Sequence, residues 1–250
     1  MNIINKKNFL THLKRLGLKS TDNVLVYSNL SSFGSLDKNL PKRILDYLLS
    51  FFTIKGTLVM PSYTFDHPKN FIFNINKLQK NYSTGSLVKE FFKKKNVIRS
   101  FKLIHSHIGI GKKSYILKKS NKMLSFGNDS DFDLMKKNNF KCLYLGCTPA
   151  QAATYFFHLE YINQVPYRKK IFLKKKYLFN NKTRETEIEY LSNDKLKKYN
   201  LNKSFFLMKK YGATIKEQEL RFGTSYCISL RNFHKYGNIL FKKNINFLIK

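Results

Sequence analysis

The segment NVLVYSNLSSFGS, residues 23–35, decides the fold expected for this chain. Its first six residues are a short apolar run, which predicts a buried strand, and the rest is a polar loop. A helix is expected from Pro41 to Phe52, because proline is tolerated in the first turn of a helix. Residues 56–60 (GTLVM) predict a second buried strand, which Pro61 ends.

The same alternation continues on both sides of this segment. Four further helices are expected at residues 6–16, 83–92, 150–163 and 203–211, and a third strand at residues 141–146. Strands and helices in this order indicate an α/β sheet with crossover connections. Between them, residues 66–82 form a long loop of the kind that often serves as a lid or binding loop. The sequence shows no clear linker, so we expect a single domain over residues 1–250.

Residues 169–192 predict a long β-hairpin added to this domain. The run at residues 171–179 meets the run at residues 183–190 across an Asn-Asn-Lys turn at residues 180–182. Asparagine tolerates the positive φ that tight hairpin turns require. We interpret the hairpin as a surface addition to the domain.

The composition describes a globular chain with an extreme charge. Of its 250 residues, 42% are hydrophobic, which excludes global disorder. The formal net charge is +32, and nearly all the excess is lysine. Lysine, asparagine, isoleucine, phenylalanine and tyrosine are abundant together, as in strongly AT-biased genomes. Nucleic-acid surfaces favour arginine, so we rank nucleic-acid binding low, whereas a polyanionic cofactor or substrate fits the charge.

Signals for a membrane or an oxidising compartment are weak. No stretch approaches the roughly 18 uncharged apolar residues of a membrane span, so we expect no membrane partner. The N-terminal helix is amphipathic and lacks the apolar core of a signal peptide. Three cysteines (Cys142, Cys147 and Cys227) are too few for a disulfide framework. We expect a cytoplasmic protein, and homo-oligomer formation is compatible with the sequence.

Three local motifs offer weaker alternatives for chemistry. HIGIGKKS at residues 107–114 resembles a phosphate loop, but Ser106 stands where the Walker pattern needs glycine and Lys113 where it needs serine or threonine. His105 and His107 would share a face of a strand, yet no cluster at ligand spacing supports a metal site, and we expect none. Cys147 follows a strand and could act as a nucleophile, although a lone cysteine there is more often a buried apolar residue.

The segment TYFFHLEY, residues 154–161, carries the best candidates for catalysis. It places His158 and Glu160 in otherwise apolar sequence, ahead of VPYR at residues 165–168. Histidine accepts and releases a proton near neutral pH, and a nearby carboxylate orients it and stabilises its charged form. The two residues could therefore serve as a general base. The alternative is a core helix with one hydrogen-bonded histidine and one structural glutamate.

The polar loop at residues 28–35 is the best candidate for cofactor binding. Its hydroxyls and free backbone N–H groups lie at the carboxyl end of a predicted strand and ahead of a predicted helix. Such groups suit the phosphate and amide groups of a cofactor. The alternative is an ordinary serine-rich surface loop.

These pieces occur together in an order that resembles the aminoglycoside 3-N-acetyltransferase family. The similarity covers nearly the whole chain, and no single piece is diagnostic. The matching pieces are LGL (16–18), LVYSNLSSFG (25–34), GTLVMPSYT (56–64), TGSL (84–87), Arg99-Ser100, Ser106, IGK (110–112), FGNDS (126–130), LGC (145–147), the His158/Glu160 segment and VPYR (165–168). The resemblance implies the family's α/β fold, with a central mixed sheet, flanking helices and the added hairpin.

The resemblance also implies an enzyme and a reaction. Members of the family use acetyl-CoA as cosubstrate and acetylate an amine of an amino sugar or an aminoglycoside by direct attack, which makes a cysteine nucleophile unnecessary. His158 would accept the amine proton as general base, oriented by Glu160. The residues implied to bind the cofactor are Ser28, Asn29, Leu30, Ser31, Ser32, Phe33, Gly34, Tyr63, Thr64 and Ser106.

The chain departs from the family's usual pattern at two places. Tyr27 stands where histidine is usual at the end of the first strand. In the family's Thr-x-x-His-x-x-Glu motif, Phe157 occupies the histidine position and His158 is shifted by one. A regular helix advances about 100° per residue, so His158 and Glu160 lie about 200° apart and pair only if the helix is bulged or ends there. Otherwise His158 has another partner, or activity is reduced.

The choice of acceptor rests on charge. A polycationic aminoglycoside needs an acidic cleft, and only a few acids are expected near the site: Asp66, Asp129, Asp131, Asp133 and Glu160. A chain with a net charge of +32 repels a polycation, so we prefer an amino sugar, nucleotide-linked or part of a surface glycan. Two other classes stay open: a catalytically impaired homologue that binds CoA or a glycan and, ranked last, a basic nucleic-acid-binding protein.

Overall fold

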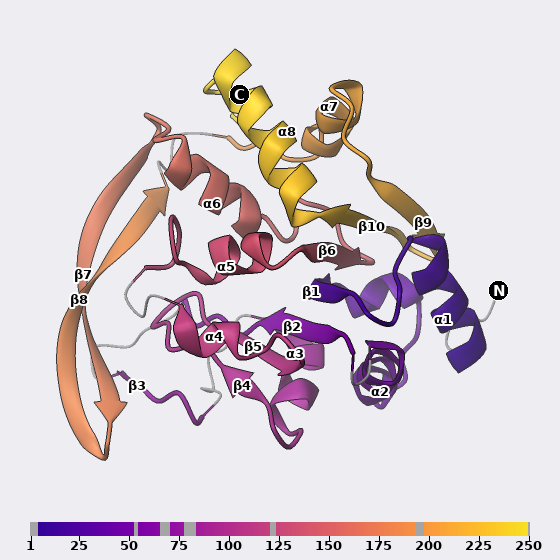
Figure 1. Cartoon of the computed structure of the whole chain (residues 1–250), viewed down its shortest axis with the longest axis horizontal. Helices are drawn as coiled ribbons and strands as arrows, with labels where there is room; N and C mark the ends of the chain where they lie inside the picture. Colours follow the sequence, from indigo (N-terminus) through magenta and orange to yellow (C-terminus); the bar gives the residue numbers. More distant parts are fainter. Residues whose placement is uncertain are drawn as a thin grey trace.

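The computed structural model describes residues 5–52, 55–65, 71–77, 84–120, 124–193 and 198–249. Its centre is a seven-stranded sheet in the order β4-β5-β2-β1-β6-β10-β9 (Figure 1). The middle strands β1 (Asn23–Ser28), β2 (Thr57–Pro61) and β6 (Phe140–Leu145) run parallel to one another. Antiparallel pairs extend the sheet through β4 (Ile98–Arg99), β5 (His107–Gly111), β9 (Lys216–Leu220) and β10 (Gly223–Ser229). The expected mixed sheet is confirmed.

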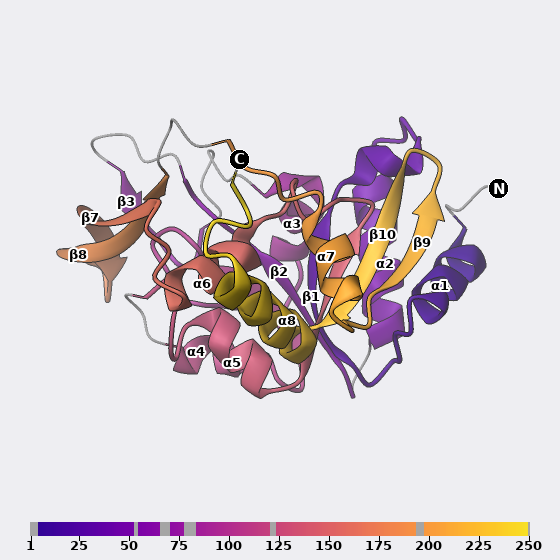
Figure 2. The same cartoon turned by 90° about the horizontal axis from the view of Figure 1, so that it is seen from above.

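Helices cover both faces of this sheet because successive strand residues point to opposite sides. Val24 and Val26 pack with α1 (Lys6–Arg15), α2 (Leu40–Phe52) and α3 (Gly85–Phe92). Leu25 and Tyr27 face the other layer of the core. That layer contains α4 (Ile116–Lys119), α5 (Asp131–Lys137), α6 (Thr154–Ile162), α7 (Ser204–Lys210) and α8 (Leu230–Lys243). In Figure 2, α1 and α2 lie toward one side of the molecule, and α4, α5 and α6 toward the other.

The predicted hairpin is confirmed and is longer than expected. β7 (Arg168–Phe179) pairs with β8 (Lys182–Asn193), and the two strands stand at one side of the molecule in Figure 1. Asn180 and Asn181 form the turn with φ of 48° and 59°, which asparagine tolerates better than most residues. A short strand, β3 (Ile72–Phe73), adds to β7 and makes a separate three-stranded sheet.

Several boundaries differ from those expected. The polar loop after β1 contains a short 3-10 helix, η1 (Leu30–Phe33), and α6 begins at Thr154 because the residues before it form turns. Of the loop predicted over residues 66–82, residues 66–70 and 78–82 lie outside the described residues, and β3 lies between them. Within the described ranges, no helix is both long enough and apolar enough to cross a membrane.

Candidate active site

The carboxyl ends of the parallel strands β1, β2 and β6 meet at one edge of the sheet, and a pocket of about 450 Å³ opens there. This is the edge at which open α/β sheets bind ligands, and the volume lies in the range usual for ligand pockets. The polar and aromatic side chains that line it include Tyr27, Ser28, Tyr63, Phe65, Thr154 and Phe157. None of the described residues that line it carries a formal charge. The pocket therefore offers hydroxyl groups and aromatic rings.

Two tyrosines form the inner wall of this pocket. The hydroxyls of Tyr27 and Tyr63 lie 3.5 Å apart, and their side chains are almost completely buried. Tyr27 stacks on Tyr144 with ring centroids 5.3 Å apart, which fixes its ring. Burial raises the pKa of Tyr27 and of Tyr63 well above the usual value, so both hydroxyls keep their protons at neutral pH.

A chain of hydrogen bonds runs from Tyr63 into the core. The Tyr63 hydroxyl lies 3.0 Å from Nε2 of His107, and Nδ1 of His107 lies 2.7 Å from a carboxylate oxygen of Asp131. Ser100 donates its hydroxyl to the same oxygen of Asp131 and accepts the backbone N–H of His107 at 2.9 Å. The Lys102 ammonium lies 3.8 Å from the other Asp131 oxygen. All five side chains are at least nine-tenths buried.

The charge on Asp131 fixes the direction of these hydrogen bonds. Burial raises the pKa of Asp131, but Lys102, His107 and Ser100 together outweigh it, so the pKa is lowered and the side chain is ionised. A carboxylate can only accept, so Nδ1 of His107 carries a proton, and in the neutral ring Nε2 has a free lone pair. In that form Nε2 accepts the Tyr63 O–H, and the Tyr63 oxygen accepts from Tyr27 and Thr154.

His158 lies away from this pocket. Its fully buried ring packs between Phe132 and Tyr155, with centroids 5.5 and 5.4 Å away, and Nδ1 accepts the Gly127 backbone N–H. Burial lowers the pKa of His158 to about 3, so it is neutral at pH 7. The structure does not fit the expectation that His158 is a general base in the pocket, because core side chains enclose its ring.

Glu160 points in another direction. Its carboxylate forms a buried ion pair with Arg168, whose guanidinium also lies 4.2 Å from the centroid of the Phe157 ring. Burial raises the pKa of Glu160, and Arg168 lowers it part of the way back. Because α6 is a regular helix here, no bulge brings Glu160 to His158. Phe157 is the residue of this helical turn that lines the pocket.

The residues expected to bind the cofactor divide into two groups. Ser28 and Tyr63 line the pocket. Asn29, Leu30 and Ser31 follow Ser28 at the same edge and are at least partly exposed, and the Asn29 side chain accepts the Ser31 hydroxyl at 2.7 Å. These five residues lie where a cofactor could reach them.

The other five residues expected to bind the cofactor pack against or hydrogen-bond to neighbouring parts of the fold. The Ser32 hydroxyl donates to the Gly146 carbonyl, and Phe33 is buried in the core. Gly34 has a φ of 65°, and an added Cβ would meet Phe222. Thr64 and Ser106 are fully buried, and Ser106 donates to the Ser62 carbonyl at 2.7 Å. These five residues stabilise the edge of the sheet from inside the protein.

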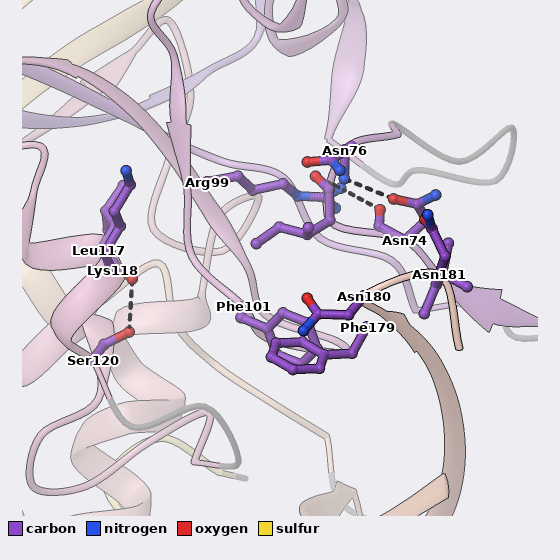
Figure 3. A pocket seen from close by; sticks show the side chains of 12 residues that line it. Asn74, Asn76, Arg99, Phe101, Leu117, Lys118, Ser120, Phe179, Asn180 and Asn181 are labelled. Atoms are coloured by element: carbon purple, nitrogen blue, oxygen red, sulfur yellow. Dashed lines mark hydrogen bonds between the residues drawn. The ribbon is translucent and has the colours of Figure 1, made fainter. Parts of the chain in front are cut away.

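A second and larger pocket, of about 520 Å³, lies beneath the tip of the hairpin (Figure 3). Arg99 forms part of its wall, but its guanidinium donates to the Lys77 carbonyl at 2.8 Å and to the Ser106 hydroxyl at 3.0 Å. Asn180 and Asn181 of the hairpin turn form the opposite part. This pocket does not touch the carboxyl ends of the parallel strands, so we place the chemistry in the smaller one.

The alternatives for a nucleophile and a metal find little support. Cys147 is buried, and burial raises its pKa to about 12, so its thiol is protonated at neutral pH. Among the residues that the structure describes, no group of three His, Cys, Asp or Glu side chains could hold a metal ion. His107 instead serves in the hydrogen-bonded chain behind Tyr63. Its pairing with Asp131, which lies 24 residues further along the chain, leaves no local pattern from which it could be predicted.

Comparison with solved structures shows the same fold in several proteins, among them aminoglycoside acetyltransferases. The YokD protein of Bacillus subtilis is 22% identical, with 96% of this chain and 99% of that chain covered and a TM-score of 0.79. A complex of AAC(3)-IVa with gentamicin is 20% identical, with 98% and 90% covered and a TM-score of 0.80. AAC-IIIb with CoASH is 15% identical, with 96% and 97% covered and a TM-score of 0.79. Comparison with curated proteins gives no match.

The sequence profile that matches this chain spans residues 25–242, which includes the central sheet, apart from the first two residues of β1, and the pocket at its edge. With this fold and this match, the protein is classed as an acetyl-CoA-dependent acetyltransferase. More narrowly, the chain belongs to the aminoglycoside 3-N-acetyltransferase family. The expected family is therefore confirmed.

Proposed function

We propose that the protein transfers the acetyl group of acetyl-CoA to the amine of an amino sugar, in the pocket at the carboxyl edge of β1, β2 and β6. The observation that carries this proposal is the pocket itself, which is uncharged, lined with hydroxyls and located at the ligand-binding edge of a fold shared with acetyltransferases. Acetyl-CoA is the cosubstrate of the family. We also propose that the chain acts as a single domain in the cytoplasm, where acetyl-CoA is available.

The reaction requires two substrates side by side. The neutral amine attacks the thioester carbonyl carbon, a C–N bond forms, and the C–S bond breaks to release CoA. Binding both substrates in one pocket makes the step effectively unimolecular. Ser28 and the exposed turn from Asn29 to Ser31 could hydrogen-bond the cofactor at the mouth, and the net charge of +32 attracts its phosphates.

The choice of an amino sugar over an aminoglycoside rests on what surrounds the pocket. Asp131 and Glu160 are buried and paired with cations, and neither lines the pocket. Asp66 lies outside the described residues. Gentamicin, bound to AAC(3)-IVa, is a polycation, and such a ligand would find no carboxylate among the described residues of this pocket. A sugar with a single amine does not need carboxylates in the pocket.

A panel of acceptors tests this proposal. Initial rates of CoA release would be measured with acetyl-CoA and sugar nucleotides that carry one amine, with free amino sugars and with kanamycin-type aminoglycosides. We expect kcat/KM to be highest for acceptors with one amine. Higher turnover of kanamycin-type amines would overturn the preference, and no turnover of any amine would overturn the proposed activity.

A second candidate is a homologue that binds CoA or a glycan without acetylating anything. The observation that favours it is Phe157, which lies on the pocket wall where the family usually has histidine, while His158 is buried elsewhere. Calorimetry that shows CoA binding together with no CoA release on the full amine panel would select this candidate. A random DNA duplex serves as the control for binding driven by charge alone.

A further inference from the structure

The hydrogen-bonded chain behind Tyr63 has the parts of a proton-transfer system. It begins at the hydroxyl of Tyr63, a residue that lines the pocket, continues through an imidazole and ends at a buried carboxylate. In serine hydrolases a buried carboxylate likewise holds a histidine in one tautomer, so that its second nitrogen can take the proton of a hydroxyl. Here the hydroxyl belongs to Tyr63, and the buried pair consists of His107 and Asp131.

The residues around this hydrogen-bonded chain hold Tyr63, His107 and Asp131 in place. Three groups converge on Asp131: His107, Ser100 and Lys102. A buried charge is costly unless several groups compensate it, and these three groups compensate the Asp131 carboxylate. The His107 ring packs edge-on against Phe132, with centroids 4.9 Å apart, which fixes its orientation.

We propose that Tyr63 is the catalytic proton relay of the acetyl transfer, and that His107 and Asp131 are the residues that position and drive it. The inference rests on the proposed function, because it assigns roles within that reaction. In this proposal the imidazole that takes the proton is that of His107, which acts through the Tyr63 hydroxyl, and not that of His158. Tyr63 would touch the reacting amine, whereas His107 and Asp131 would act through Tyr63.

The proton movements balance. As the amine nitrogen bonds to the carbonyl carbon, its proton moves to the Tyr63 oxygen while the Tyr63 proton moves to Nε2 of His107. The resulting imidazolium is stabilised by the Asp131 carboxylate. When the C–S bond breaks, the sulfur leaves with the electron pair, and the proton returns from His107 through Tyr63 to give the free thiol of CoA.

The two transfers must occur together. Burial raises the pKa of Tyr63, which makes a free tyrosinate costly in this wall. A hydroxyl that gives one proton as it receives another never carries a full charge. Tyr27 cannot replace Tyr63, because among the described residues its hydroxyl contacts the Tyr63 hydroxyl and no basic group.

Kinetics of matched variants test the relay. Tyr63→Phe removes only the hydroxyl and keeps the ring, so we expect kcat to fall by about 10²-fold or more, while the affinity for CoA measured by calorimetry stays within about threefold. Asp131→Asn should lower kcat by at least about tenfold. His158→Asn is the control, because Oδ1 of asparagine can accept the Gly127 N–H, and it should keep kcat within about threefold.

The outcomes separate the two proposals. If the wild-type protein acetylates an amine and Tyr63→Phe keeps kcat within about threefold, the relay is overturned while the proposed function stands. If the wild-type protein binds CoA and acetylates no amine, the proposed function itself fails. Solvent isotope effects add a readout that a structural role would not change: two protons in flight give a curved proton inventory on kcat, and a linear inventory contradicts the relay.

A spectroscopic measurement needs no turnover. In protein labelled with ¹⁵N-histidine, the His107 signals would be assigned by their loss in His107→Gln. We expect the tautomer with the proton on Nδ1, and a shift of the Nε2 signal in Tyr63→Phe. A proton on Nε2 of His107 would contradict the relay, because that nitrogen could then not accept from Tyr63.

Discussion

Phe157 and His158 are neighbours in the sequence and have opposite surroundings. One step along a helix turns the side chain by about 100°, which is enough to take it from the pocket wall into the core. Phe157 lines the pocket, and His158 lies between Phe132 and Tyr155. This angle per residue predicts from sequence that His158 and Glu160 lie on different sides of a regular helix. Whether Phe157 or His158 faces the pocket depends on where β1 and β2 end, which the helix sequence does not contain.

Buried histidines make the fold sensitive to acid. Burial lowers the pKa of His158 to about 3, of His105 to about 3 and of His12 to about 4, against 6.5 in the unfolded chain. The unfolded chain therefore binds more protons below pH 6.5, so stability is complete above that pH and is lost as the pH falls toward the folded values. We expect the free energy of unfolding, measured by urea titration, to fall steadily from pH 6.5 to pH 5.

His158→Asn removes one of these groups and serves as the comparison. Each fully buried histidine contributes a loss of about 1 kcal/mol per pH unit in this range. The variant should therefore show a shallower loss of stability between pH 6.5 and pH 5 than the wild-type protein. Equal slopes for the two proteins would mean that His158 can bind a proton in the folded state.

Glu160 and Arg168 connect α6 to the start of β7. Their side chains are 0% and 2% exposed, so the pair holds the helix against the hairpin from inside the protein. We expect Arg168→Met to cost about 3–5 kcal/mol of unfolding free energy, because it leaves a buried carboxylate without its cation. The double variant Glu160→Gln/Arg168→Met should recover at least half of that loss. Urea titrations at pH 7 measure both, and equal stability of the single and double variants would contradict the role of the pair.

The elements differ in how far sequence could predict them. The strands β1, β2 and β6 and the hairpin have strong local signals: apolar runs, and two asparagines at the turn. α5 was not predicted, because it has only seven residues and its first two, Asp131 and Phe132, have partners in distant segments. Asp131, its first residue, is stabilised in the core by His107 and Lys102, and such long-range pairing leaves no periodic pattern.

The net charge of +32 should increase the rate at which the protein binds acetyl-CoA. A field of this sign attracts the phosphates of acetyl-CoA over distances that salt shortens to about 10 Å at 0.1 M. We expect kcat/KM for acetyl-CoA to fall at least severalfold as ionic strength rises, with little change in kcat. Acetylated pantetheine lacks the phosphates of the nucleotide and is the control, since its kcat/KM should be nearly independent of salt. An equal salt dependence for both thioesters would contradict electrostatic attraction of the cofactor.

A crystal structure of the protein with bound CoA tests the location of the chemistry most directly. We expect the sulfur in the pocket at the carboxyl edge of β1, β2 and β6, beside the hydroxyls of Tyr27 and Tyr63 and the ring of Phe157. The Tyr63 hydroxyl should lie within reach of an amine that attacks the thioester, at about 3 Å from the reacting nitrogen. A sulfur found in the pocket beside Arg99, or next to His158, would contradict both the site and the roles assigned to its residues.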